Sequence, residues 1–341
     1  MMKVVEFRGA GGPEILHLAR RDRPRAKAGE VLVRVLAAGV NRPDIQQRRG
    51  LYPPPPGASD LPGLDVAGII ETIGEGVQNF HIGDPVCALV NGGGYAEYCA
   101  VSEKQCLAIP RGLTFEQAAS LPEVFFTAWN NIFLIGRLSH GESLLVQGGT
   151  SGVGLAAIQM ARHLRNATVF ATAGNQLKLQ TCVDVGCAGA FDYHGNWAEQ
   201  VRSAIGEQGI DLILDGQAGA YTQKHLDLLA SGGRVVLIAS HLGAVGEINF
   251  RQMVRRHQTL CGSTLRPCSA EFKGRIARDL MNEVWPLLED GRIETKMHAV
   301  IPFDEVAEAH RILDANVQIG KVVLSVMPDL SSSIPNEVQG D

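Results

Sequence analysis

The sequence of 341 residues lacks the features that mark several large classes of protein. It contains no run of about 18 apolar residues, so no membrane-spanning helix is expected. Residues 1–14 have no apolar core of the kind found in secretory signals, and we expect a cytoplasmic protein. The seven cysteines include no Cys-x-x-Cys pair, which predicts reduced, mostly buried thiols and no thiol metal site. The net charge of −5 argues against nucleic acid or an anionic membrane as a partner.

The chain is long enough for two domains with a large buried core. Its first part is expected to form short strands separated by glycine and proline, at residues 30–38, 65–73 and 85–90. Four consecutive prolines in residues 52–57 remove four backbone donors, so this segment cannot be a helix or a central strand. We expect it to form a stiff, extended surface loop.

Further along the chain, apolar strands alternate with helices. Strands are predicted at residues 143–149, 168–174, 190–193, 210–216 and 234–240, and helices at residues 152–164 and 176–185. Continuous apolar strands separated by helices predict a parallel sheet that is covered on both faces. The last part is expected to contain helices at residues 276–288 and 303–315 and strands at residues 296–301 and 321–326.

These patterns predict an α/β protein with a β-rich domain and a doubly wound parallel-sheet domain. The last part of the chain is expected to rejoin the β-rich domain, which then comprises residues 1–125 and 266–341, with the parallel-sheet domain at residues 126–265. Residues 259–265 are expected to form the edge strand of the parallel sheet. The polar segment 330–341 is expected to be disordered.

A glycine-rich segment, VQGGTSGVG at residues 146–154, joins a predicted strand to a predicted helix. Its glycines at 149, 152 and 154 follow a GxxGxG spacing instead of the usual GxGxxG. Backbone N–H groups and the positive end of a helix dipole favour a pyrophosphate at such a loop. Glycine is expected there because a Cβ atom would block the close approach of the phosphates. The segment therefore predicts a nicotinamide dinucleotide site, and the alternative is a plain tight turn.

The end of the next predicted strand distinguishes between the two nicotinamide dinucleotides. An NAD site usually places an acid there, whereas this chain has Ala173, Gly174 and Asn175, and the nearest downstream acid is Asp184. A 2′-phosphate is therefore not repelled, and Lys178 could pair with it. This favours NADPH, and the alternative for Lys178 is a solvated charge on a helix.

The architecture resembles the medium-chain dehydrogenase/reductase superfamily over essentially the whole chain. Zinc alcohol dehydrogenases of that superfamily carry a cysteine in a G-x-C-x-x-D stretch and a later G-H-E. Here the two stretches read Gly39-Val-Asn41-Arg-Pro-Asp44 and Gly63-Leu64-Asp65. Leu64 has no lone pair, and an amide is a poor zinc ligand, so we expect an enzyme without zinc. Without a Lewis acid, alcohol oxidation is disfavoured, whereas reduction of quinones or conjugated alkenes needs less help.

Several motifs resemble the quinone oxidoreductase (zeta-crystallin) branch, and within it most closely the tumour-suppressor-inducible type. They are the stretches at residues 41–44, 47–55, 57–59, 92–94, 122–128 and 320–324. The resemblance implies a GroES-like domain, a Rossmann domain, NADPH-dependent reduction of quinones, and a homodimer formed through the edge strand at residues 259–265. It also implies cofactor contacts by Gly149, Ser151, Gly152, Val153, Gly154, Gly174, Asn175, Lys178, Tyr193 and Lys321.

Four residues are candidates for the active site, each with packing as the alternative. Asn41 would bond the quinone oxygen or the ribose, and Asp44 would orient its neighbours. Tyr52 would stack on a ring or donate its O–H group to a quinone oxygen that gains negative charge. The resemblance places Thr127 against the nicotinamide. Among further residues, Phe125 is either core or pocket, and His241 lies either beside the nicotinamide or on a surface loop.

The sequence therefore predicts a zinc-independent NADPH:quinone reductase with nicotinamide and substrate in a cleft between the two domains. Two other functions stay open. One is an NADPH-dependent reductase of alkenals or enones, which would use the same cofactor without zinc. The other is a non-catalytic protein that binds NADPH in a sensing or structural role.

Overall fold

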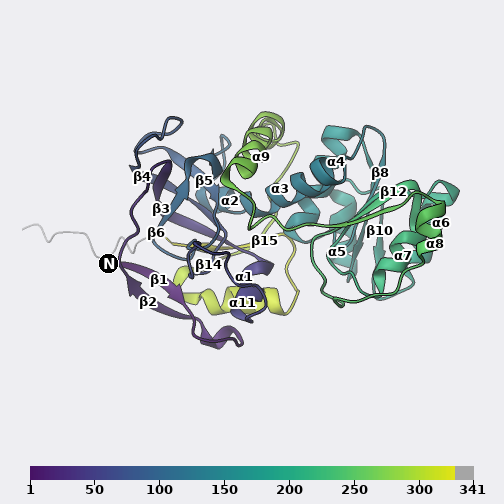
Figure 1. Ribbon diagram of the computed structural model, residues 1–341, viewed down its shortest axis with the longest axis horizontal. Coiled ribbons are helices and arrows are strands. Elements are labelled where there is room, and N and C mark those ends of the chain that lie inside the picture. Colours follow the sequence, from purple (N-terminus) through teal and green to yellow (C-terminus); the bar gives the residue numbers. More distant parts are fainter. Residues whose placement is uncertain (327–341) are drawn as a thin grey trace, which may run out of the picture.

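The computed structural model describes residues 1–326, and the predicted disordered segment 330–341 lies outside the described residues. Figure 1 shows two sheets side by side along the longest axis of the molecule, with helix α9 above their junction. The chain builds most of the first sheet, then the second, and returns to the first with its last two strands. In the described part of the chain, no helix has both the length and the apolar character needed to cross a bilayer.

The first sheet has seven strands, and its order shows how the two ends of the chain combine. The order is β14-β15-β3-β4-β5-β7, with β6 paired to β3. All of its pairs are antiparallel except the parallel pair of β14 and β15. The strands are β3 (Glu30–Val40), β4 (Asp65–Ile73), β5 (Pro85–Leu89), β6 (Tyr98–Ser102), β7 (Cys106–Ala108), β14 (Met297–Pro302) and β15 (Lys321–Ser325). The predicted return of the chain to the β-rich sheet is therefore correct.

The second sheet has six parallel strands in the order β10-β9-β8-β11-β12-β13. They are β8 (Ser143–Val146), β9 (Thr168–Ala173), β10 (Gly189–Asp192), β11 (Ile210–Asp215), β12 (Leu229–Leu237) and β13 (Thr259–Gly262). The strand order reverses between β8 and β11, which is where ligands bind in doubly wound sheets. The predicted α/β class, with a parallel Rossmann-type sheet beside a β-rich domain, is confirmed, and β13 is the predicted edge strand.

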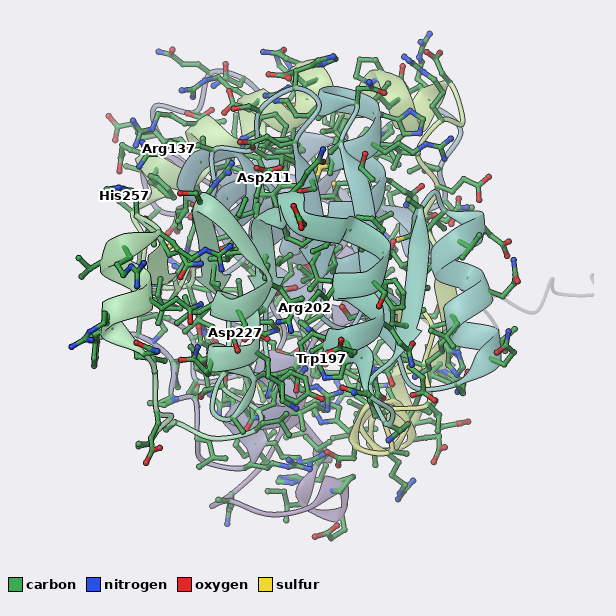
Figure 2. The ribbon with its side chains drawn as sticks, turned by 90° about the vertical axis from the view of Figure 1, so that its right-hand side faces the viewer. Arg137, Trp197, Arg202, Asp211, Asp227 and His257 are labelled. Carbon is green, nitrogen blue, oxygen red and sulfur yellow. The ribbon has the colours of Figure 1, made fainter. Side chains whose placement is uncertain are left out.

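Both faces of the parallel sheet are buried, because successive side chains on each strand enter different cores. Leu144 of β8 belongs to the large core that α4 (Gly152–Arg165) and α9 (Ala270–Glu283) cover. Its neighbour Leu145 belongs to the core under α6 (Trp197–Ile205) and α7 (Tyr221–Leu228). Figure 2 looks onto this second side, with Arg202 of α6 and Asp227 of α7 labelled. The continuous apolar strands of the sequence follow from burial on both faces.

Several predicted elements have different bounds in the structure. The strand expected to begin at residue 234 begins at Leu229, because the register against β11 shifts around Gly232, whose φ is +77°. The helix predicted at residues 276–288 is two helices, since Pro286 lacks an N–H group and lies in the first turn of α10 (Trp285–Glu289). The helix predicted at residues 303–315 is a 3-10 turn (Phe303–Glu305) followed by α11 (Val306–Asp314).

Sequence periodicity did not predict the short helices. These are α1 (Arg42–Arg48), α2 (Phe115–Ala119), α3 (Pro122–Ala128), α8 (Phe250–Arg255) and the π-helix Trp129–Ile135 that continues α3. Each has too few turns to show a helical period. The proline segment 52–57 forms neither helix nor strand, as predicted. The cysteines are free thiols, and five of the seven are buried, which agrees with the expected mostly buried thiols. A two-stranded ribbon, β1 (Met2–Glu6) and β2 (His17–Arg21), completes the first domain.

A buried ion pair joins three adjacent strands of the first sheet. Lys321 at the start of β15 is 5% exposed, and Asp65 at the start of β4 is fully buried. The Lys321 Nζ atom lies 2.8 Å from Asp65 Oδ2 and 2.5 Å from the Oδ1 atom of Asn41, which follows β3. Asn41 Nδ2 donates to the same Asp65 oxygen at 2.8 Å. Next to Lys321, the N–H group of Gly320 donates to Thr150 O at 2.8 Å, so this contact also reaches the glycine-rich loop.

Replacement of Lys321 by methionine should lower the free energy of unfolding by about 3–5 kcal/mol, because Asp65 would keep a buried charge without its partner. The matched control is Lys296→Met, which removes an exposed pair with Glu294 at 3.0 Å and should cost less than about 1 kcal/mol. Urea unfolding followed by tryptophan fluorescence measures both values. Equal losses in the two variants would contradict the central role of the buried pair.

Candidate dinucleotide and active site

The glycine-rich loop follows β8 and leads into α4 with its shape fixed by its own hydrogen bonds. Gly148 has a φ of +81°, a left-handed conformation that favours glycine. Its N–H group donates to Thr172 Oγ1 at 3.2 Å, and the N–H group of Gly149 donates to Thr172 O at 2.8 Å. Ser151 caps α4 by accepting the N–H group of Gly154 at 3.0 Å, and its hydroxyl donates to Gly148 O at 2.9 Å. The GxxGxG reading did not include Gly148, although Gly148 makes the turn.

The other glycines of the loop are required by contacts within the protein. A Cβ atom on Gly149 would lie 2.6 Å from Ala171 Cβ, and one on Gly154 would lie 2.5 Å from Gly148 O. On Gly152 it would lie 2.8 Å from a methyl group of Val124 in α3. The interpretation that these glycines serve the approach of a phosphate is therefore incomplete, because close packing of strand, helix and loop already demands them. Val153 packs against the large core at the start of α4.

The loop suits the pyrophosphate of a nicotinamide dinucleotide. It lies at the carboxyl end of β8, where the strand order reverses, and it opens a helix of 14 residues. Within residues 1–326, the N–H groups of Thr150 and Val153 make no hydrogen bond. N–H groups at a helix start, together with the helix dipole, bind anions. This Rossmann-type domain therefore implies NAD(P) as the cofactor.

A buried polar network lies behind the loop, and sequence reasoning missed it. Thr172 Oγ1 donates to Gln147 Oε1 at 2.6 Å, and the Gln147 amide nitrogen lies 2.8 Å from His225 Nε2. His225 Nδ1 lies 3.3 Å from Asp215 Oδ2. Burial alone would raise the pKa of Asp215, but the contact with His225 holds that pKa below its ordinary value. The sequence signal was a polar residue at the carboxyl end of each of three apolar strands, β8, β9 and β11.

Four predicted cofactor residues meet at the start of α5 (Gln176–Asp184). Asn175 Oδ1 accepts the N–H group of Lys178 at 2.9 Å and caps the helix. A Cβ atom on Gly174 would overlap the hydroxyl of Tyr193, so the tyrosine lies directly against this glycine. Lys178 is 6% exposed, and its Nζ atom donates to Asn316 O at 2.7 Å. The alternative of a solvated helix charge is therefore wrong for Lys178.

A second cation lies near Lys178. Burial lowers the pKa of Lys178, and the positive charge of Arg42 lowers it further. Arg42 donates to Leu313 O at 2.8 Å and lies 3.4 Å from Asn316 Oδ1. The sequence showed Arg42 only as part of the motif at residues 41–44, because nothing local relates it to a helix that begins at residue 176. Two cations therefore lie near the start of α5, together with the carboxylate of Asp314, whose charge raises the pKa of Arg42 against the effect of burial.

Two predicted active-site residues are part of the buried polar core. Asn41 is 4% exposed, and its amide oxygen and nitrogen are hydrogen-bonded to Lys321 and Asp65. Its contact with a quinone stays a prediction. Asp44 is fully buried and accepts the N–H groups of Asn41 at 2.8 Å and Gly63 at 3.1 Å. Burial raises the pKa of Asp44 to about 6. These contacts agree with the expected role of Asp44 in orienting its neighbours, and a direct part in catalysis stays a prediction.

The residues at the position of the catalytic zinc ligands do not suit a zinc ion. Asn41 and Asp65 both bind the ammonium group of Lys321, and a second cation beside it would be repelled. Leu64 is buried and offers no donor atom. Among residues 1–326, no three histidine, cysteine, aspartate or glutamate side chains lie close enough together to hold a metal ion.

Tyr52 and Thr127 lie on the two sides of the segment that follows β13. The hydroxyl of Tyr52 is 3.4 Å from Thr264 Oγ1. Thr127 O accepts the amide of Asn131 at 2.7 Å, and Asn131 Oδ1 accepts the hydroxyl of Ser263 at 2.5 Å. Residues 263–264 therefore connect α3 with the proline segment. Substrate contact by Tyr52 and cofactor contact by Thr127 stay predictions.

The two further candidates of the sequence lie in different surroundings. Phe125 is 4% exposed and packs edge-on against Trp285 with ring centroids 6.4 Å apart, so it is a core residue. His241 is exposed, and its N–H group donates to Gly216 O at 3.1 Å beside the carboxyl end of β11. His241 therefore lies on a surface loop at the ligand-binding end of the parallel sheet.

Glu123 is a titratable residue of this region that sequence reasoning missed. Its N–H group donates to Asp65 Oδ1 at 2.6 Å, and its carboxyl accepts the hydroxyl of Thr127 at 3.4 Å. Burial raises the pKa of Glu123 to about 7, the charge of Lys321 opposes that shift, and Asp65 adds to it. The residue belongs to the motif at residues 122–128, but only the tertiary structure shows that it is half-buried and lies near Lys321 and Asp65.

The Glu123→Gln variant should become more stable relative to the unchanged protein as pH rises from 5 to 8. The folded-state pKa of about 7 lies above the ordinary 4.5, so the folded protein holds the proton more tightly. The unchanged protein therefore loses stability as pH rises from about 4.5 to about 7, and glutamine does not. Urea unfolding at pH 5, 6, 7 and 8 measures the difference. The exposed Glu283→Gln control should show no such trend, and a flat difference for Glu123→Gln would refute the assignment.

Comparison with known proteins agrees with this architecture. Residues 27–111 match the family described as alcohol dehydrogenase GroES-like domain, and residues 152–282 match the family described as zinc-binding dehydrogenase. The quinone oxidoreductase of Rattus norvegicus is 33% identical over 327 residues, covering 95% of this chain and 96% of that protein. The synaptic vesicle membrane protein VAT-1 homolog of Danio rerio is 30% identical, covering 94% of this chain and 69% of that protein.

The fold of this chain is also similar to that of a solved quinone oxidoreductase structure. The quinone oxidoreductase of Pseudomonas syringae pv. Tomato DC3000 superposes with a TM-score of 0.84 at 25% identity, covering 95% of this chain and 100% of that chain. The family description names zinc, yet the positions expected to hold it carry Asn41 and Leu64. The chain is thus an oxidoreductase of the medium-chain dehydrogenase/reductase superfamily, in the branch that contains the quinone oxidoreductases and the VAT-1 homologues.

Proposed function

We propose that this protein is an NADPH-dependent quinone reductase that works without zinc, of the tumour-suppressor-inducible type. The observation that carries the proposal is the buried contact of Lys321 with Asn41 and Asp65. An ammonium group that is held in this way is no Lewis acid, so an alkoxide would lack the stabilisation that alcohol oxidation requires. An electron-poor acceptor such as a quinone needs no metal. The relatives named quinone oxidoreductase support the same class of acceptor.

The choice of NADPH is supported by the charge around the start of α5. No acid stands at residues 173–175, and Lys178 and Arg42 bring two positive charges near the end of β9. Asn175 uses its Oδ1 atom as the helix cap, and in residues 1–326 its Nδ2 donor has no partner, so it can serve a phosphate oxygen. Tyr193 lies against Gly174 beside these groups. Together they would recognise the 2′-phosphate.

The chain's own residues would bind and orient the reactants. NADPH, when bound, supplies the hydride that reduces the acceptor. The N–H groups at the start of α4 would hold the pyrophosphate, and the Gln147–Thr172 contact would keep the loop rigid. Tyr52 would stack on the ring of the acceptor. Water can protonate the reduced quinone, so the proposal requires no strong base.

A homodimer through the edge of the parallel sheet belongs to the same proposal. Strand β13 is the last strand of its sheet, and its outer edge has no paired strand in residues 1–326. Helix α8 precedes it and presents Phe250, which is 70% exposed, and Val254, which is 74% exposed. An unpaired edge next to apolar side chains favours strand pairing with a second copy. The resemblance to the quinone oxidoreductases points to the same edge.

The first test is the initial rate of NADPH and NADH oxidation with 9,10-phenanthrenequinone, 1,4-benzoquinone and 2-hexenal in the presence of EDTA. We expect turnover of the quinones that prefers NADPH and is insensitive to the chelator. Activity with the enal alone would instead favour the alkenal and enone reductases. Binding of NADPH without oxidation by any acceptor would favour the sensor or structural role.

The Lys178→Met variant should raise the KM for NADPH by about tenfold or more, because one charge-assisted contact with the 2′-phosphate is lost. The KM for NADH should not change, since that cofactor carries no 2′-phosphate. Steady-state kinetics with both cofactors and one quinone measure the effect. A similar rise for both cofactors would show that Lys178 does not read the phosphate.

A further inference from the structure

Arg266 has a buried guanidinium group of which one nitrogen has no partner. The residue follows β13, and its side chain is 6% exposed. Its Nε and Nη2 atoms donate to Asn91 O at 3.0 Å and 2.8 Å, and Nη2 also donates to Gln47 Oε1 at 2.8 Å. Within residues 1–326, the buried Nη1 atom makes no hydrogen bond. An unpartnered charged donor is costly to bury, so this atom calls for a partner from outside the chain.

The positive charge of Arg266 is not neutralised by its hydrogen-bond partners. All of its acceptors are neutral, a backbone carbonyl and an amide oxygen. Burial lowers the pKa of Arg266, and Asp44 opposes that shift from a distance, because the bonds of Asp44 are to Asn41, Gly63 and Tyr95. A buried cation with neutral partners attracts an anionic oxygen or one that gains negative charge.

An aromatic ring lies beside the guanidinium group. The ring centroid of Tyr52 is 5.4 Å from the central carbon of the Arg266 guanidinium. Tyr52 comes from the proline segment of the first domain and Arg266 from the segment after β13, so two distant parts of the chain form this pair. The 3.4 Å contact between the Tyr52 hydroxyl and Thr264 joins the same two segments. An arginine and a tyrosine ring together suit a flat, conjugated ligand that carries an oxygen.

The pair lies at the end of the parallel sheet where ligands bind. The N–H group of Ser263 donates to Leu237 O at 2.9 Å, so the segment that leads to Arg266 passes the carboxyl end of β12. Ser263 also bonds Asn131, which bonds the backbone of Thr127. Binding at the carboxyl ends of the strands is the rule for open α/β sheets. Arg266 is therefore close, along the chain and through hydrogen bonds, to the expected nicotinamide contact.

We propose that Arg266 and Tyr52 form the acceptor subsite, in which Nη1 donates a hydrogen bond to a carbonyl or carboxylate oxygen of a planar, conjugated ligand. This rests on the proposed function for the identity of the acceptor as a carbonyl compound. The guanidinium group stabilises the negative charge that the acceptor oxygen gains on reduction, without a metal. Tyr52 stacks on the ring of the ligand and selects flat molecules. Nε and Nη2 meanwhile hold the guanidinium plane in place through Asn91 and Gln47.

The test is binding of salicylate and of its neutral analogue salicylamide to the full chain, measured by isothermal titration calorimetry without cofactor. The two probes share a ring and differ in the charged oxygen. The unchanged protein should bind salicylate about tenfold more tightly than salicylamide. Arg266→Met should abolish this preference, and Arg266→Lys should restore part of it. Tyr52→Leu should weaken both probes alike and leave the preference.

The matched control is Arg48→Met, because Arg48 is another buried arginine whose three nitrogens all have partners. This variant should lose stability but keep the preference for salicylate. If Arg266→Met fails to fold, Arg266→Lys decides the matter, because it should keep only part of the preference for salicylate. Equal binding of the two probes by the unchanged protein, or an unaltered preference in a folded Arg266→Met variant, overturns the subsite.

Turnover separates this inference from the proposed function. A protein that shows the Arg266-dependent preference but reduces no quinone has the subsite and a different reaction. A protein that reduces quinones with unchanged kcat and KM in a folded Arg266→Met variant has the reaction, and the subsite is refuted. If both hold, Arg266→Met should lower kcat/KM for quinones and leave NADPH binding unchanged.

Discussion

The structure depends on a lysine that is buried among polar groups of three neighbouring strands. Lys321 begins β15, Asn41 follows β3, and Asp65 begins β4. The ammonium group of Lys321 donates to the carboxylate of Asp65 and to the amide oxygen of Asn41. The amide nitrogen of Asn41 donates to the same carboxylate. Because a buried charge without a partner is very costly, these three strand ends have to stay in register. The adjacent Gly320 donates to Thr150, so the same constraint positions the glycine-rich loop.

Two further polar networks make the surroundings of the site rigid. Behind the loop, Gln147 and Thr172 connect β8 and β9, and His225 connects Gln147 to Asp215 at the end of β11. In the first domain, Asp44 holds the turn at the start of α1 and bonds the hydroxyl of Tyr95 at 3.2 Å. These side chains are buried and already bonded, so their role is to position others.

The groups proposed to contact ligands lie near the carboxyl ends of the parallel strands. They are the first N–H groups of α4, the cations near the start of α5, the ring of Tyr52 and the Nη1 atom of Arg266. An anionic cofactor and a flat acceptor with a polarised oxygen fit such a set of donors and cations. The charge stabilisation attributed to a metal in zinc-dependent enzymes would, in the proposed subsite, fall to the guanidinium group of Arg266. Charge stabilisation by fixed donors needs the rigid support that the buried networks supply.

The comparison of sequence and structure separates local from long-range information. Alternating apolar strands and helices predicted the parallel sheet, and the residues at 41 and 64 predicted the loss of the zinc ligands. The break at Pro286 was also readable, since proline cannot continue a helix from within. The early start of β12 could not be predicted from the sequence, because the register shift at Gly232 depends on the pairing of β12 with β11. The sequence also did not predict the short helices α1 and α3, although these helices carry Asp44 and Glu123.

By itself, the sequence determined the class of fold, the place of the dinucleotide loop and the lack of an acid after β9, because these depend on neighbouring residues and local spacing. Only the tertiary structure decided which distant side chains meet. Lys321 reaches Asp65 across 256 positions of the chain, and Arg266 reaches Gln47 across 219. Such contacts depend on the order and register of the strands. The raised pKa of Glu123 depends in turn on its burial, which is a property of packing that no single segment encodes.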